Sequence, residues 1–124
     1  FEESGLGPGG ESGRIVARPD IFGDVVLARK EAPASYHLAV VVDDALQGVT
    51  LVTRGNDLFQ AAHLQRLLQA LLDLPVPRYR HHRLIADASG KRLAKRDAAT
   101  SLKALRESGW SAARVRDEFG FTNR

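Results

Sequence analysis

Four lysine and arginine side chains fall within eight residues of this chain, in the stretch GKRLAKRD from Gly90 to Asp97. The stretch follows the turn-like residues DASG (87–90). Clustered cations can neutralise phosphoryl oxygens, and a glycine beside them can serve as the hinge of a closing loop. A loop that closes on a polyphosphate is one interpretation of this pattern, and a solvated charge run is the other. The spacing alone leaves both open.

Other polar positions have side chains that suit a binding site, namely Tyr36, Arg54 and the pair Asp43-Asp44. Arg54 precedes a glycine at the end of an expected strand, where its guanidinium could hold a carboxylate through two hydrogen bonds or lie on the surface. Tyr36 precedes an apolar run, so its hydroxyl could face a pocket or its ring could pack at the edge of the core. Adjacent strand residues point to opposite faces, so we interpret Asp43 and Asp44 as hydrogen-bonding residues at a strand end.

Metal binding by residues of this chain is not predicted. The chain has no cysteine, and zinc-ligand spacing is absent from its histidines, which are His37, His63, His81 and His82. The stretch GLGPGG (5–10) matches the G-x-G-x-x-G pattern of nucleotide-binding loops. We expect no strand before it, and its proline and glycines oppose a helix after it, so the context of such a loop is missing.

Composition places the chain among ordinary globular proteins. With 124 residues it forms one domain at most, and its 44% hydrophobic and 27% charged residues argue against disorder throughout. No apolar run approaches the roughly 18 residues that a membrane-spanning helix needs. The net charge of +3 is compatible with an RNA or nucleotide partner, although so small an excess is weak evidence.

Hydrophobic patterning predicts the elements that must position these residues. Residues 1–22, rich in Gly, Glu and Ser, are expected to form a flexible connector. The elements predicted after it are a strand at 35–42 buried on both faces, a strand at 49–53, a helix from Asn56 or Asp57 to Leu72, a strand at 79–85, and two short helices starting near residues 100 and 111. This order predicts an open α/β sheet. Ligands bind beyond the carboxyl ends of strands in such sheets, which selects Arg54 and the cationic loop.

Three stretches resemble the catalytic core of class I glutamyl-tRNA synthetases: YHLAVVVDDALQGVTLVTRGNDL (36–58), LPVPRYRHH (74–82) and GKRLAKRD (90–97). The resemblance runs from Gly23 to Phe121 and is strongest to the short members of the family, the glutamyl-Q tRNA(Asp) synthetases. It implies an α/β fold, the C-terminal part of a Rossmann-like nucleotide-binding domain with a mostly parallel sheet and flanking helices. It also implies a catalytic-core segment at 23–97 that ends in a signature loop, followed by short C-terminal helices at 98–124.

The resemblance also implies roles for individual residues. Tyr36 and Arg54 fall on positions that bind the glutamate substrate. The stretch RLAKR, Arg92 to Arg96, is similar to the KMSKS signature loop, in which Lys95 falls on a catalytic lysine that contacts ATP. The other loop residues expected at ATP are Arg92, Leu93, Ala94 and Arg96. His81 matches a family histidine near the nucleotide.

The activity implied by the resemblance is activation of glutamate by ATP, with Mg²⁺, to glutamyl-adenylate, and transfer of glutamate to queuosine in the anticodon of tRNA(Asp). The implied partners are therefore L-glutamate, ATP and queuosine-bearing tRNA(Asp). We expect a cytoplasmic monomer without membrane contact. Two alternatives stay open: a catalytic-domain fragment of an ordinary glutamyl-tRNA synthetase, and a non-catalytic RNA-binding remnant of a synthetase.

Several family features are missing from these 124 residues. The HIGH-type motif and the zinc-binding cysteines would lie upstream, so zinc is expected only there and the chain by itself is expected to be inactive. Ala94 replaces the usual serine of the signature loop, which removes a hydroxyl donor. The residues AAHL (61–64) replace a more typical Ser-Thr-Pro-Arg stretch, which puts any role for the start of that helix in doubt.

Overall fold

The computed structural model describes residues 1–86 and 101–121. Contacts divide the chain into two compact units, residues 1–83 and 84–124. None of the helices in the described ranges is both long enough and apolar enough to cross a membrane. The cationic stretch from Gly90 to Asp97 lies outside the described residues.

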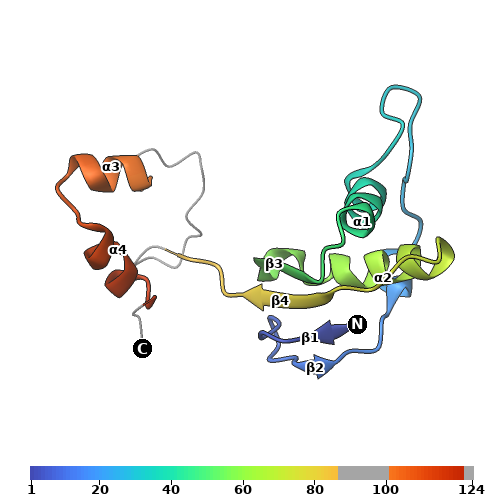
Figure 1. Ribbon diagram of the computed structural model, residues 1–124, viewed down its shortest axis with the longest axis horizontal. Helices are drawn as coiled ribbons and strands as arrows, with labels where there is room; N and C mark the ends of the chain where they lie inside the picture. Colours follow the sequence, from blue (N-terminus) through green and yellow to red (C-terminus); the bar gives the residue numbers. More distant parts are fainter. Residues whose placement is uncertain (87–100, 122–124) are drawn as a thin grey trace. The chain divides into compact units, whose positions relative to one another are not determined.

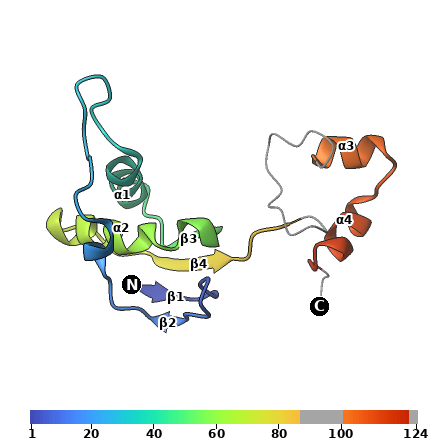
Figure 2. The same cartoon turned by 180° about the vertical axis from the view of Figure 1, so that it is seen from behind.

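The first unit is built on a four-stranded sheet in the order β2-β1-β4-β3 (Figures 1 and 2). Its strands are β1 (Glu2–Glu3), β2 (Gly13–Arg14), β3 (Leu51–Gly55) and β4 (Arg78–His82). β4 pairs in parallel with both β3 and β1, whereas β2 pairs antiparallel with β1. The predicted α/β class with a mostly parallel sheet is confirmed. Parallel pairing also brings the carboxyl ends of β1, β3 and β4 to the same edge of the sheet.

Two helices pack against each other in the first unit, each preceded by a short 3-10 helix. The order is η1 (Pro19–Phe22), α1 (Tyr36–Leu46), η2 (Asn56–Leu58) and α2 (Ala61–Leu71). Leu64 and Leu68 of α2 are buried with Val41 of α1 in the hydrophobic core. The leucine spacing of three and four predicted α2, because it places apolar side chains on one helix face. The residues expected to cap α2, Asn56 and Asp57, form part of η2 instead.

The stretch predicted as a buried strand, residues 35–42, lies in helix α1, so that prediction is wrong. Ser35 caps the helix, because its hydroxyl accepts a hydrogen bond from the backbone N–H of Leu38 at 3.3 Å. Each valine disfavours a helix by at most about 0.7 kcal/mol relative to alanine, and packing against α2 outweighs this. Asp43 and Asp44 therefore lie within a helix, which also corrects their interpretation as strand-end residues.

Part of the stretch predicted to be a flexible connector, residues 1–22, forms β1, β2 and η1. β1 ends at Glu3, with one residue between it and GLGPGG, so the expectation that no strand stands before this stretch is wrong. The glycines permit close packing here: a Cβ atom on Gly7 would lie 2.7 Å from Cε2 of Phe59. The next helix, η1, begins at Pro19 and so does not open from the glycines. The division of the chain into domains at 22 and 97 stays a prediction.

The second unit contains α3 (Leu102–Glu107) and α4 (Ala112–Glu118), the two short helices that the sequence predicted. Ser101 and Ser111 cap them, since each hydroxyl accepts a hydrogen bond at 3.1 Å from the backbone N–H three residues ahead. Neither helix contains a buried residue. Local capping therefore contributes more to these helices than a hydrophobic core does.

Candidate functional site

Arg54 turns its side chain from β3 into the protein, and only 9% of the residue is exposed. Its Nε donates a hydrogen bond to Nε2 of His81 at 3.1 Å, and its Nη1 donates to Oε1 of Gln65 at 2.8 Å. Its Cζ atom lies 5.1 Å from the ring centroid of Tyr79. Nη2 is buried and has no hydrogen-bond partner among the described residues. A buried guanidinium with such a nitrogen is suited to donate a hydrogen bond to an anionic ligand.

The elements around Arg54 hold it from two sides. β3 and β4 run in parallel, and Arg54 stands opposite His81 in their register. Exposed and buried residues alternate along β4, so Tyr79 and His81 face the interior. Gln65 comes from the buried face of α2. The guanidinium is thus positioned by a neighbouring strand and by a helix, rather than by a loop.

Glu3 extends this network through His81. Oε2 of Glu3 and Nδ1 of His81 are 2.5 Å apart, and both side chains are fully buried. Oε1 of Glu3 accepts hydrogen bonds from the backbone N–H groups of His81 at 3.0 Å and Gly5 at 2.7 Å. Burial acts to raise the pKa of Glu3, but the hydrogen bonds from His81 and Gly5 outweigh it, and the pKa lies below its usual value. Glu3 is therefore a buried carboxylate that is joined to Arg54 through His81.

Among the described residues, several buried polar atoms have no hydrogen-bond partner, and two of them belong to residues that interact with Arg54, namely Gln65 and His37. In the described ranges these atoms are Nη2 of Arg54, Nδ1 of His37, Oδ1 of Asn56, Nε2 of Gln65 and Oε1 of Gln69. Gln65 bonds Arg54 through its other amide atom. Burial lowers the pKa of His37, and the positive charge of Arg54 lowers it further, so His37 is within electrostatic reach of the guanidinium. Native proteins leave few buried polar atoms unpaired, so this group points to a place that binds a polar molecule.

Helix α1 also contributes to the surroundings of Arg54. Tyr36 is its first residue and is 53% exposed, and its ring packs edge-on against His37 with the centroids 5.4 Å apart. No hydrogen bond joins Tyr36 to Arg54 in the described part of the chain. Asp44 is within reach of the same charge: burial raises the pKa of Asp44, and Arg54 opposes that rise. The structure thus adds Asp44 and His37 to the neighbourhood that the sequence assigned to Tyr36 and Arg54.

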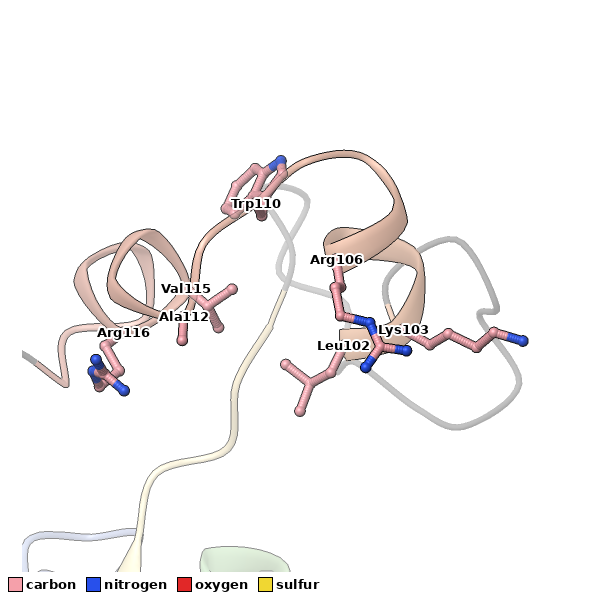
Figure 3. A pocket seen from close by; sticks show the side chains of 7 residues that line it. All are labelled: Leu102, Lys103, Arg106, Trp110, Ala112, Val115 and Arg116. Carbon is pink, nitrogen blue, oxygen red and sulfur yellow. The ribbon is translucent and has the colours of Figure 1, made fainter.

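A second concave region, the groove between α3 and α4, has an apolar floor and a cationic rim (Figure 3). Its volume is about 440 Å³, and it is lined by Leu102, Lys103, Arg106, Trp110, Ala112, Val115 and Arg116. The guanidinium of Arg114 lies 3.9 Å from the ring centroid of Trp110 and occupies one face of that ring. The residues that line this groove all belong to the second unit.

Similarity to known proteins identifies the family of this chain. The family described as tRNA synthetases class I (E and Q), catalytic domain, matches residues 11–117. The chain belongs to this family. A glutamyl-Q tRNA(Asp) synthetase of Rhodobacter capsulatus is 53% identical, over 97% of this chain and 44% of the relative. Another of Nocardia farcinica is 49% identical, over 74% of this chain and 30% of the relative.

Ordinary glutamate enzymes of the same class are also similar to this class I synthetase domain. A glutamate–tRNA ligase of Aquifex aeolicus is 40% identical, over 79% of this chain and 21% of the relative. The solved glutamate-tRNA synthetase from Elizabethkingia anophelis is 28% identical with a TM-score of 0.54, over 70% of this chain and 16% of that chain. The chain therefore spans less than half the length of these relatives. The predicted resemblance to the glutamyl-tRNA synthetase family, and within it to glutamyl-Q tRNA(Asp) synthetases, is confirmed.

The structure of this synthetase domain describes some of the predicted site residues and not others. It describes Tyr36 and Arg54, whereas Lys95 and the loop residues expected beside it lie outside the described ranges: Arg92, Leu93, Ala94 and Arg96. His81, expected near the nucleotide, has both ring nitrogens engaged, one by Glu3 and one by Arg54. The roles assigned to Tyr36, Arg54 and Lys95 stay predictions.

The sequence indicated His81, but neither its pairing with Glu3 nor the glutamines of α2. Glu3 and His81 are separated by 78 positions, so no local pattern could pair them. Gln65 and Gln69 carried a usable signal, because two glutamines at a four-residue spacing lie on the buried face of an amphipathic helix. Within the described ranges, no three His, Asp or Glu side chains lie where they could share a metal ion.

Proposed function

We propose that this synthetase domain binds glutamate and ATP, forms glutamyl-adenylate, and serves an enzyme that transfers glutamate to queuosine in the anticodon of tRNA(Asp). Two kinds of observation support the proposal. Residues 11–117 belong to the catalytic-domain family of the glutamate and glutamine enzymes. Relatives with 53% and 49% identity carry the name glutamyl-Q tRNA(Asp) synthetase, which supports this acceptor.

One observation carries the assignment of glutamate: Nη2 of Arg54 is buried and unpartnered while Nε and Nη1 are engaged. Such a guanidinium offers a fixed donor to a carboxylate in a site shielded from water. Glutamate has a side-chain carboxylate in addition to the carboxylate that reacts. A hydrogen bond to a charged group contributes about 1.5–3 kcal/mol. We assign the hydroxyl of Tyr36, at the start of α1, to the same pocket.

In the proposed reaction the protein positions the substrates and stabilises the charge that develops. An oxygen of the α-carboxylate of glutamate attacks the α-phosphorus of ATP, a new P–O bond forms, and the bond to pyrophosphate breaks. Arg54 holds the side-chain carboxylate and so leaves the α-carboxylate free to react. Lys95 stabilises the charge that develops on pyrophosphate. Mg²⁺ would be held mainly by the phosphates of ATP and would offset their negative charge, because this ion keeps few protein ligands in such sites.

A second candidate function is ordinary glutamyl-tRNA synthesis. The 40% identity to a glutamate–tRNA ligase and the likeness to a solved glutamate-tRNA synthetase favour it. Both functions share the activation of glutamate, so the Arg54 site supports them equally. The RNA that accepts the glutamate therefore distinguishes the two functions.

The deciding experiment offers radiolabelled glutamate and ATP to the intact protein together with tRNA(Asp), prepared with and without queuosine, and in a separate reaction with tRNA(Glu). The proposal expects ATP-dependent labelling of the queuosine-containing tRNA and no labelling of the other. Labelling of queuosine-free tRNA(Glu) assigns the second candidate function instead. RNA binding without any use of ATP assigns the non-catalytic alternative. Glutamine is the matched control substrate, since its neutral amide lacks the charge that Arg54 is proposed to bind.

A further inference from the structure

Glu3 is a member of the buried network that does not contact Arg54. It lies in β1, and β4 separates β1 from the strand that carries Arg54 (Figure 1). We propose that Glu3 is a positioning residue: it fixes the protonation of His81, and His81 in turn holds Arg54 with Nη2 directed at a carboxylate ligand. The identity of that ligand rests on the proposed function. The hydrogen-bond relay from Glu3 to Arg54 rests on the contacts alone.

The directions of the hydrogen bonds carry the inference. An ionised carboxylate can only accept, so Nδ1 of His81 carries the proton that it shares with Glu3. The neutral imidazole then has an unprotonated Nε2, which can accept from Nε–H of Arg54 at 3.1 Å. A proton on Nε2 would place two N–H groups opposite each other at that distance. Arg54 would have to turn away, and its Nη2 would move with it because the guanidinium is planar.

Other contacts already hold the side chains of Glu3 and His81 in place, so the main contribution of Glu3 is to fix which nitrogen of His81 carries the proton. Oε1 of Glu3 is fixed by the backbone N–H groups of His81 and Gly5. The imidazole plane is held by aromatic neighbours, edge-on by Phe59 at 5.0 Å and parallel to Tyr79 at 6.0 Å between centroids. Since the ring is already held by these contacts, the negative oxygen at Nδ1 mainly selects which nitrogen is protonated.

The test is Glu3→Gln in the intact protein. Its amide oxygen can still accept from the two backbone N–H groups, which turns the amide N–H₂ toward Nδ1 of His81 and forces that nitrogen to accept. Nitrogen-15 NMR of His81 should therefore show the proton moved from Nδ1 to Nε2. The Michaelis constant for glutamate should rise about tenfold or more, while the Michaelis constant for ATP stays constant. Effects of this size occur when the hydrogen-bond partner of a metal-binding histidine is removed. Glu2→Gln, an equal change of charge at an exposed position of β1, is the matched control.

A double-mutant cycle separates positioning from plain stabilisation. If Glu3 acts through Arg54, the effect of Glu3→Gln on the glutamate constant should shrink in an Arg54→Lys background. Additive effects, or a proton that stays on Nδ1 in Glu3→Gln, overturn the inference. If the wild-type protein shows the Nδ1 proton and the shift in Glu3→Gln but does not use glutamate, the proposed function fails and the relay stands. Should Glu3→Gln not fold, Glu3→Asp takes its place: its carboxylate must keep the proton on Nδ1, and a proton on Nε2 overturns the relay.

Discussion

Replacing Arg54 by lysine should keep the buried charge and remove the planar fork that the site uses. In the wild type, Nε and Nη1 are engaged by His81 and Gln65, which leaves Nη2 for the ligand. Lysine has one nitrogen, so it can replace one of these contacts but cannot reproduce three in a fixed plane. We expect Arg54→Lys to fold and to bind ATP normally, and to bind glutamate weakly.

The expected size follows from the hydrogen bond lost at the ligand. A bond to a charged group contributes about 1.5–3 kcal/mol, which corresponds to a rise of about 10- to 150-fold in the Michaelis constant for glutamate. Arg54→Ala should act differently, because it leaves two buried acceptors, Nε2 of His81 and Oε1 of Gln65, without their hydrogen-bond donor. Leaving a buried acceptor unsatisfied costs about 1–3 kcal/mol, so that variant should lose stability as well as glutamate binding. The lysine variant is therefore the sharper test of binding.

The assay is glutamate-dependent pyrophosphate exchange by the intact protein, measured against glutamate and against ATP, with thermal unfolding as the check of folding. Arg80→Lys is the matched control, because Arg80 lies on the neighbouring strand β4 at an exposed position, opposite Thr53 in the register. The reasoning would be refuted by an Arg54→Lys variant with a normal unfolding temperature and a glutamate constant within about twofold of the wild type.

Three further outcomes are expected. Lys95→Ala should lower the single-turnover rate of adenylate formation by about a hundredfold, and Lys91→Ala should do much less; equal rates would favour a solvated charge run. Tyr36→Phe should raise the Michaelis constant for glutamate and leave the unfolding temperature unchanged, because Tyr36 is 53% exposed; an unchanged constant would remove its hydroxyl from the pocket. Folding lowers the pKa of Glu3 from its ordinary value of 4.5, so its contribution to stability is present above that pH and is lost as the pH falls further. Acid denaturation should therefore be steeper for the wild type than for Glu3→Gln, and equal steepness would contradict this.

Elements whose stabilising interactions are local could be predicted from the sequence. The leucine spacing identified α2, and the serines before α3 and α4 identified the starts of those helices. Arg54 was selected because it follows a strand, and it does lie near the carboxyl end of β3. The stretch from Tyr36 to Leu58 is contiguous, so the family could be recognised without any knowledge of the fold. Each of these signals depends on residues that lie close together in the sequence.

The sequence by itself therefore determined the family, the α/β class and Arg54 as a candidate, whereas tertiary contacts decided α1 and the partners of Arg54. The run LAVVV (38–42) suits a buried strand as well as a helix, and packing against α2 favours the helix. Glu3 reaches His81 only because β1 pairs with β4 across 78 positions of chain. A buried charged residue needs polar or charged partners, and the fold decides which residues supply them. The local sequence around Glu3 carries no information about its distance from His81.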